Sequence, residues 1–313
     1  MYDTIKFWLP TERIKESGYL QRVPTLLTNA KETYKQDTGE VYFTGSILGM
    51  SASISNAGIS LKGSICKSYL NDNFKTLTRQ DTQRAIEQIQ DITKLLILQA
   101  DVKQIDFAQN IIVSQKPNTF YNLLGECHHY TRLVQPKSVY YNNSMRQKVF
   151  YSKVDEGKAK GQILPSVWAN KHVLRYELRY TSRLPQQFNT SQIQAFNLFD
   201  EVFYIGMVER WINEYKNINK NNSILHQMNS KKIKKPNDYI LQLALMKINE
   251  IGINGVLEGI EDLKAQKHFK HNQSYSRLKA TIKKLCTTYQ PDEGKSLINE
   301  LDKKIMQVKE YYR

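Results

Sequence analysis

Cysteine is scarce in this sequence, and its placement excludes the frameworks that cysteine usually builds. The 313 residues include Cys66, Cys127 and Cys286, an odd number at wide spacing. That spacing indicates neither a set of disulfides nor a paired-cysteine metal site, and it suits a reducing compartment. Long apolar runs are missing too: no window comes near the roughly 18 uncharged apolar residues of a membrane span, and the N-terminal segment is too charged for a signal peptide. We therefore expect a cytoplasmic protein with no membrane partner.

Acidic residues are few relative to basic ones. Lys and Arg number 45 against 30 Asp and Glu, which leaves a formal net charge of +15 and a pI near 9.5. Such an excess opposes compaction by self-repulsion unless a polyanion neutralises it, and nucleic acid is the commonest polyanionic partner. An anionic membrane surface, or solubility alone, would also suit this charge. The hydrophobic share of 40% is ordinary, so the chain should fold.

The spacing of apolar residues changes near residue 190. Before it, short alternating runs broken by glycine, and the pair SVYYNN and QKVFYSKV, predict a curved antiparallel sheet. TRQDTQRAIEQIQDITKLLILQA predicts an amphipathic helix on that sheet, with Asp81 as its candidate N-cap. We expect an α+β fold: an antiparallel β-sheet with packed helices over residues 1–190, then an α-helical domain over 191–313 for DNA binding or oligomerisation. The Asn-rich basic segment NKNNSILHQMNSKKIKKPND reads as a linker or exposed loop.

Polar side chains interrupt three predicted strands at places where a strand normally buries apolar residues. If the strands are neighbours, alternation brings these polar faces together. The strands are QIDFA, VLRYELRY and VFYSKV, and the residues are Asp106, Arg175, Glu177, Arg179, Tyr151 and Lys153.

These residue types suit phosphoryl chemistry. The carboxylates of Asp106 and Glu177 are ligands of the kind that hold Mg²⁺ or Mn²⁺, and Arg175, Arg179 and Lys153 would neutralise phosphate. A tyrosine hydroxyl beside them is a candidate nucleophile, because a phosphotyrosine ester conserves the bond for later rejoining. Each residue alone has a plainer explanation: a structural strand tyrosine, a solvated R-x-E-x-R face with cross-strand pairs, or a carboxylate with a structural partner. Together they predict a strand-transferring nuclease.

The order QIDFA, SVYYNNSMRQKVFYSK and LRYELR resembles the replication-initiator family typified by the filamentous-phage gene II protein and its plasmid and prophage relatives. The earlier ISLKGSICKSYLNDNFKTL is similar to that family's Lys- and Gly-rich segment, so the resemblance spans about residues 40–185. It implies a rolling-circle replication initiator that nicks one strand at an origin through a 5′-phosphotyrosine intermediate, leaves a 3′-OH primer and rejoins the displaced strand. The implied partners are origin DNA and the host's helicase, polymerase and single-strand-binding protein, and the implied cofactor is Mg²⁺ or Mn²⁺.

The resemblance also assigns roles to positions. The family's nucleophile falls on Tyr151, with Tyr140 and Tyr141 as rivals on the same hairpin. The remaining family positions fall on Lys153, Asp106, Glu177, Arg175 and Arg179. These initiators are usually grouped with HUH-type endonucleases, which use a five-stranded antiparallel sheet, but QIDFAQN lacks the two-histidine motif. The third metal ligand is therefore open, with His129 of GECHHY as the candidate and an exposed polar pair near a turn as the alternative.

Several lysines are candidates for DNA contacts that do not read sequence. Solvated surface charge explains them equally well. They are Lys62, Lys67 and Lys75 before the predicted helix, and Lys231, Lys232, Lys234 and Lys235 in the basic segment.

Two other functions compete with the nicking enzyme: a non-catalytic origin-binding protein or repressor, and a relaxase for conjugative mobilisation.

Overall fold

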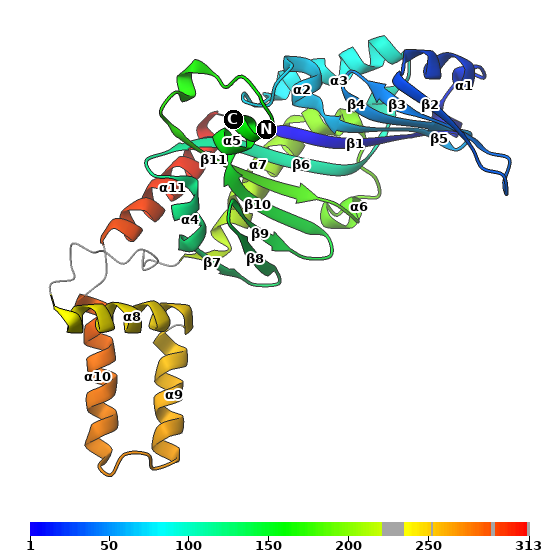
Figure 1. Cartoon of the computed structure of the whole chain (residues 1–313). Helices are drawn as coiled ribbons and strands as arrows, with labels where there is room; N and C mark the ends of the chain where they lie inside the picture. The colour runs from blue at the N-terminus through cyan, green and yellow to red at the C-terminus, as the bar shows by residue number, and fades with distance from the viewer. Residues whose placement is uncertain (221–234, 252, 289–291, 312–313) are drawn as a thin grey trace. The chain divides into compact units, whose positions relative to one another are not determined.

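The computed structural model describes residues 1–220, 235–251, 253–288 and 292–311 (Figure 1). The chain divides into two compact units. The first unit comprises residues 1–121, 126–219 and 302–313, and the second comprises 122–125 and 220–301. The functional domains expected from the sequence, 1–190 and 191–313, stay a prediction.

Within the described residues, ten strands form one antiparallel sheet, and helices dominate the chain after it. The prediction of an α+β fold, with an antiparallel sheet followed by a helical region, is confirmed. In spatial order the strands are β2 (Thr28–Tyr34), β3 (Val41–Ile47), β4 (Met50–Ser55), β5 (Gly58–Ser64), β1 (Tyr2–Pro10), β6 (Asp101–Val113), β11 (His172–Tyr180), β10 (Arg146–Ser152), β9 (Ser138–Asn142) and β8 (Thr131–Gln135). A separate pair is formed by β7 (Leu124–Cys127) and β12 (Ile218–Lys220).

The helices connect these strands and make up most of the second unit. The α-helices that begin before residue 220 are α1 (Tyr19–Arg22), α2 (Ile65–Leu70), α3 (Arg79–Thr93), α4 (Pro117–Leu123), α5 (Lys153–Ala159), α6 (Leu184–Gln187) and α7 (Glu201–Lys216). Those after it are α8 (Pro236–Ile251), α9 (Ile253–Ala265), α10 (Asn272–Thr288) and α11 (Asp292–Tyr311). Short 3₁₀ turns are η1 (Thr11–Arg13), η2 (Val23–Leu26), η3 (Ile97–Gln99), η4 (Ser166–Trp168) and η5 (Ala195–Phe199).

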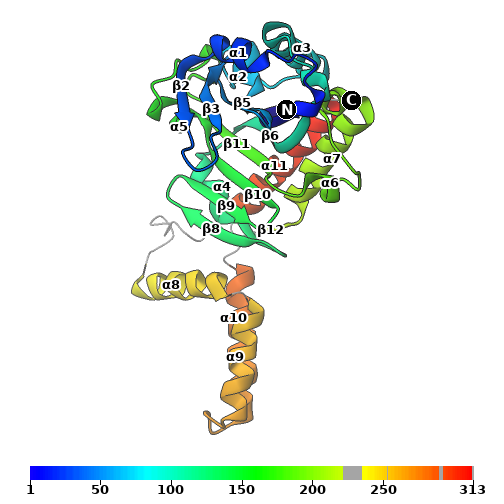
Figure 2. The same ribbon diagram turned by 90° about the vertical axis from the view of Figure 1, so that its right-hand side faces the viewer.

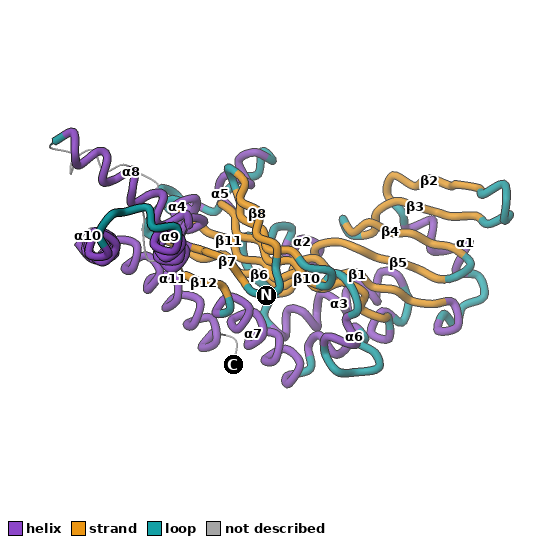
Figure 3. Tube along the Cα trace, turned by 90° about the horizontal axis from the view of Figure 1, so that it is seen from below, coloured by secondary structure: helices purple, strands orange, loops and turns teal. Residues whose placement is uncertain are grey.

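One face of the sheet is apolar and covered by helices. Tyr204 of α7 packs edge-on against Tyr2 and Phe107, and Trp211 of the same helix lies 4.6 Å from Tyr176 between ring centroids. Figures 2 and 3 show α3, α6 and α7 on this side of the sheet and α5 on the other. Because successive strand residues alternate between faces, the positions between these aromatic residues lie on the opposite face, which we call the polar face.

The N-cap of helix α3 lies three residues before the candidate, Asp81. Thr78 is the N-cap, and its hydroxyl accepts a hydrogen bond from the backbone N–H of Asp81 at 3.1 Å. The Asp81 carboxylate in turn accepts from the backbone N–H of Thr78 at 3.1 Å. The prediction of Asp81 as N-cap is therefore wrong, because the reciprocal capping box puts the acid at the third helical position.

None of the helices in the described ranges combines the length and the apolar character that crossing a membrane requires.

Candidate active site

The three strands that carry the predicted polar residues are neighbours, in the order β6, β11, β10. Tyr151 lies opposite Arg175, and Arg179 lies opposite Asp106. Directly opposed residues of an antiparallel pair share a face, so these side chains meet on the polar face. The sheet therefore brings Tyr151, Asp106, Arg175, Glu177 and Arg179 together, and their chemical roles stay a prediction.

Glu177 is the centre of this cluster. One oxygen, Oε1, accepts from the Tyr151 hydroxyl at 2.8 Å and from Arg175 Nε at 2.7 Å. The other, Oε2, accepts from Arg179 Nε at 2.9 Å and Nη2 at 2.6 Å. Burial alone would raise the pKa of this carboxyl, but the charges of the two arginines outweigh it and hold the pKa at about 2. Glu177 is therefore an anion at any physiological pH.

Tyr151 is held as a neutral phenol. Burial raises its pKa far above the ordinary value, and the neighbouring Glu177 charge raises it too, against the opposing effect of Arg175. The hydroxyl donates a hydrogen bond to the Glu177 carboxylate. A group in this state is positioned for nucleophilic attack but needs a base before it can react.

Arg175 connects the cluster to the first strand of the chain. Its side chain is 1% exposed and forms an ion pair with Asp3. Asp3 also accepts from the Ser64 hydroxyl and from Asn73 Nδ2, and Arg175 Nη1 donates to Asn110 Oδ1 at 3.0 Å. The sequence prediction missed Asp3, although an acid inside the alternating strand YDTIKFWLP was a visible signal.

Asp106 lies at the edge of the cluster and is 7% exposed. Gln104 Nε2 donates to its Oδ1 at 3.0 Å, and its Oδ2 is 3.9 Å from Arg179 Nε. Burial raises the pKa of Asp106 from 3.8 to about 6, because these two partners compensate only part of the lost hydration.

Lys153 does not share the strand of Tyr151, so the prediction that alternation puts both on one strand face is wrong. Strand β10 ends at Ser152, whose hydroxyl accepts from the backbone N–H of Asp155 and caps helix α5. Lys153 is the first residue of that helix. Its buried ammonium pairs with Glu156 at 2.7 Å, and burial, with the Arg175 charge, lowers its pKa.

The rival tyrosines lie on different faces of β9. Tyr140 is opposite Val149 and shares the polar face with Tyr151, whereas Tyr141 is opposite Lys148 and is fully buried on the helix-covered side. Position alone therefore leaves Tyr140 as the rival that a test must include.

A metal site is not formed by these residues as they are arranged. The described residues hold no group of three or more His, Cys, Asp or Glu side chains that could bind a metal ion. Both oxygens of Glu177 are engaged, and Arg179 reaches both Glu177 and Asp106. His129 lies in the exposed turn after β7 with its ring 3.7 Å from that of His128, and no described hydrogen bond or ion pair joins it to Asp106.

The candidate DNA-binding lysines have different surroundings. Lys62 is exposed on β5, Lys75 is exposed in the loop after α2, and Lys67 is half-buried in α2. Lys235 is exposed just before α8. The remaining candidates, Lys231, Lys232 and Lys234, lie outside the described residues.

The loop between α2 and α3 is tied to the cluster through its backbone. Asn110 Nδ2 donates to the carbonyl oxygens of Asn73 and Phe74 at 3.2 and 2.8 Å. The loop that contains Lys75 is therefore fixed beside Arg175, which itself bonds Asn110.

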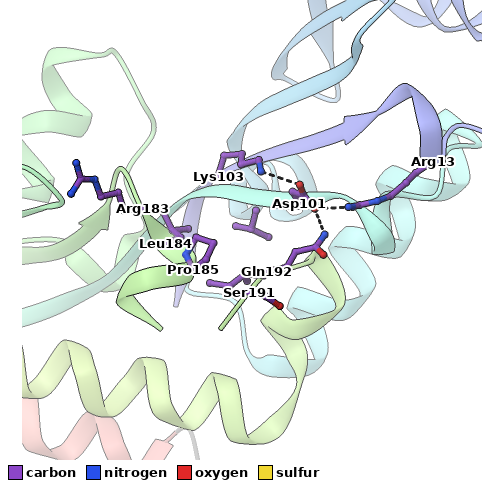
Figure 4. Close-up of a pocket in the computed structure, with 10 residues that line it drawn as sticks. Arg13, Asp101, Lys103, Arg183, Leu184, Pro185, Ser191 and Gln192 are labelled. Atoms are coloured by element: carbon purple, nitrogen blue, oxygen red, sulfur yellow. Dashed lines mark hydrogen bonds and ion pairs between the residues drawn. The ribbon is translucent and has the colours of Figure 1, made fainter. Parts of the chain in front are cut away.

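A cavity of about 360 Å³ at the start of β6 is separate from this cluster (Figure 4). Asp101 lies in it and accepts from Arg13 at 2.7 Å, from Lys103 at 2.9 Å and from Gln192. Because these groups satisfy one another, the cavity is best explained as the place where η1, through an ion pair, and the segment after α6, through a hydrogen bond, are attached to β6.

Comparison with known proteins places the chain in a family. No curated protein matches the chain. The family model for the N-terminal domain of the phage gene II replication-associated protein matches residues 1–214, which include every member of the cluster around Glu177. The resemblance seen in the sequence is thus confirmed, and the match extends it to the first strand and to α7. The chain belongs to the phage gene II type family of replication-associated proteins.

Proposed function

We propose that the protein is a rolling-circle replication initiator that nicks one DNA strand at an origin, becomes linked to its 5′ end through Tyr151, and later rejoins the strand. The observation that carries this proposal is the Tyr151 hydroxyl bonded to a carboxylate that two arginines also bind. Family membership supports a role in replication, and the cluster supplies groups suited to cutting and rejoining.

The reaction would begin with a phosphodiester at Arg179. The Arg179 side chain is 30% exposed whereas that of Arg175 is buried, so Arg179 is the arginine that an incoming phosphate reaches. As Arg179 turns from Glu177 to the phosphate, Glu177 loses one of the two charges that depress its pKa. Substrate binding would thereby make Glu177 a better base for the Tyr151 proton.

The covalent step would then exchange one ester for another. Tyr151 Oη attacks phosphorus, its proton passes to Glu177, and the bond from phosphorus to the 3′ oxygen breaks. The 3′ oxygen takes up a proton from water and becomes the primer hydroxyl, and Glu177 returns the proton it received to water. Rejoining reverses these events: a 3′ hydroxyl attacks the phosphotyrosine and Tyr151 leaves as a phenol. No oxidant or nucleotide cofactor is needed, because the number of phosphate ester bonds is unchanged.

Mg²⁺ or Mn²⁺ remains a proposal alongside this scheme. The cation would polarise a non-bridging phosphate oxygen, and Asp106 and Glu177 are the carboxylates that would hold it. In the arrangement seen here Arg179 contacts both carboxylates, so the resting site does not fit a cation, and none of the steps above depends on one. The third ligand, for which His129 was the candidate, stays a prediction.

A nicking assay tests the proposal. Supercoiled plasmid that carries the origin, with Mg²⁺ or Mn²⁺ present, should give open circles with protein on the 5′ end. Tyr151→Phe should lower nicking by at least ~10³-fold, because the nucleophilic oxygen is gone, while DNA binding persists. Tyr140→Phe is the matched control on the same face and should nick as the parent protein does.

Two outcomes would contradict the proposal. Nicking that survives Tyr151→Phe but is lost in Tyr140→Phe would move the nucleophile to β9. A protein that binds origin DNA but never nicks it would favour the non-catalytic origin-binding alternative. The relaxase alternative shares this chemistry and differs in the DNA site that is cut. The host's helicase, polymerase and single-strand-binding protein remain partners proposed from the family alone.

A further inference from the structure

The polar face extends well beyond the cluster, across β1 and the strands on its far side. Cross-strand registers align Ser51 of β4 with Lys62 of β5, and Lys62 with Lys6 of β1. A second row aligns Ser53, Ser60 and Trp8 in the same way. Their neighbours on the other face, including Ile54, Ile59 and Leu61, are buried, whereas Ser51 and Lys62 are exposed. This part of the polar face is therefore open to solvent.

Negative charge is scarce on this surface: Asp101, opposite Trp8, is an acidic residue there, and it is paired with Arg13 and Lys103. Residues 41–70, which form β3, β4, β5 and α2, include no Asp or Glu. Lys6 and Lys62 lie directly opposite each other, and no ion pair with a described residue involves either of them. Like charges in opposed positions are destabilising, and an anion placed between them relieves the repulsion. The lysine pair therefore favours a bound phosphate.

Trp8 gives the same surface an aromatic platform. It is half-buried and lies opposite Ser60 on one side and Asp101 on the other. An indole in such a setting has a flat surface for a nucleic-acid base, and stacking of this kind tolerates any base sequence.

The lysine pair leads directly to the cluster. Lys6 lies opposite Gln104 of β6, and Gln104 is the residue that donates to Asp106. From β5 to β10 the sheet crosses four strand spacings, or roughly 19 Å at the usual separation of strands. A single polynucleotide strand would span that distance.

We propose that the polar face of β4, β5 and β1 is the path along which single-stranded DNA runs to Tyr151. Lys6 and Lys62 bind its phosphates, the Ser51, Ser53 and Ser60 hydroxyls donate to its backbone, and Trp8 stacks on a base. This inference rests on the proposed function and deepens it, since it defines where the substrate lies outside the cluster.

A second basic surface supplies the matched control. A cleft of about 730 Å³ beside α5 is lined by Lys116, Lys137, Lys158 and Lys171, which are exposed and form no ion pair with a described residue. Lys116→Gln with Lys137→Gln removes the same charge as Lys6→Gln with Lys62→Gln, so the two double variants separate position from total charge.

Binding is measured by fluorescence anisotropy with a labelled mixed-sequence oligonucleotide of about 20 nucleotides, longer than a typical single-strand site. All variants carry Tyr151→Phe to prevent cleavage, and circular dichroism checks that each is folded. Lys6→Gln with Lys62→Gln should weaken binding at least ~10-fold and reduce the salt dependence by about two phosphate contacts. Trp8→Leu should weaken it about tenfold with the salt dependence unchanged. Trp8→Phe should bind nearly as the parent does, which separates a lost ring from a damaged fold.

The control double variant should bind within about twofold of the parent. Loss of binding in the control, with full binding in Lys6→Gln with Lys62→Gln, would overturn the proposal and put the strand in the cleft. Equal binding by all variants would overturn it too. The two proposals fail separately. If the protein nicks DNA through Tyr151 but the Lys6 and Lys62 variants bind DNA fully, only the proposed DNA path is refuted. If binding depends on these lysines but the protein never nicks DNA, only the proposed enzyme activity is refuted.

Discussion

Asp106 is a carboxylate kept where its charge lowers stability. Its pKa of about 6 lies above the ordinary 3.8, so the folded state favours the protonated form. The cost of ionising it is complete above about pH 6, shrinks as the pH falls towards 4, and vanishes below the unfolded value of about 3.8. A shift of this size corresponds to roughly 3 kcal/mol. Such a cost is expected of a residue that serves a reaction.

Asp106→Asn should therefore stabilise the protein at pH 8, by roughly 3 kcal/mol, and should leave stability unchanged near pH 3.5. Urea unfolding at the two pH values measures this, and nicking should fall although stability rises. Asp101→Asn is the control with the opposite sign. Burial would raise the pKa of Asp101, but Arg13, Lys103 and Gln192 outweigh it and lower that pKa, so its loss should destabilise at pH 8. A loss of stability in Asp106→Asn at pH 8 would refute the assignment.

At this scale, alternation along the chain predicted the cluster in large part. Asp106 and the R-x-E-x-R strand could be placed because β6 and β11 pair without interruption. Asp3 could not be placed in this way, because the pairing of β1 with β6 shifts register between Tyr2 and Ile5. Regular alternation along β1 therefore does not predict the face on which Asp3 lies. The position of Lys153 could not be predicted by alternation either, because the strand ends at Ser152, which caps helix α5.

Among the elements, α7 is attached to the sheet by a buried ionic contact. Lys148 of β10 is fully buried, and its ammonium lies 2.7 Å from Glu214 Oε2, with a further bond to the Glu214 carbonyl. Arg146 of the same strand also contacts Glu214. Because β10 carries Tyr151, this contact fixes the strand of the proposed nucleophile against the helix layer.

Glu214→Ala should destabilise the protein by about 3–5 kcal/mol, because it removes the carboxylate that neutralises the buried Lys148 charge. Thermal unfolding followed by circular dichroism measures the effect. The control is Glu201→Ala on the same helix, whose contact with Arg79 is long and mostly exposed and whose loss should change little. Equal, small effects of both substitutions would show that the buried pair is not what holds α7.

Element types were easier to predict than element ends. The hairpin SVYYNN–QKVFYSKV occurs as β9 and β10, since its residues alternate and its turn is rich in Asn and Ser. The segment after residue 191 was expected to be helical, and α7 is long, yet it belongs with the sheet in the first unit. Periodicity reports a helix with an apolar side but not which surface that side meets.

At the scale of the whole molecule, the last turns of α11 belong to the first unit. Asp302 accepts from the Tyr215 hydroxyl at 2.6 Å, and Lys304 Nζ donates to the Ile112 carbonyl at 2.6 Å. Ile305 is fully buried there. The chain thus returns to the sheet-containing unit after the second unit, a long-range connection that local patterns do not encode.

Ile305→Ala should lower the stability of the first unit by about 2–5 kcal/mol, the usual cost of emptying a buried aliphatic site. Tryptophan fluorescence reports that unit, because Trp8, Trp168 and Trp211 all lie in it. Met306→Ala, at the adjacent position where the side chain is 41% exposed, should change the unfolding midpoint little. An unchanged midpoint in Ile305→Ala would mean that α11 does not stabilise this unit.

The central place of β1 in the sheet has a consequence for synthesis on the ribosome. This first strand pairs with β5 and β6, and its Asp3 binds Arg175, which is made 172 residues later. A nascent or broken chain that ends before β11 can include Tyr151 but lacks Glu177 and both arginines. Such a fragment has Tyr151, the proposed nucleophile, without the carboxylate and the two guanidinium groups that surround it in the folded protein. Translation would thus delay the proposed DNA cleavage until the strand that completes the cluster has been made.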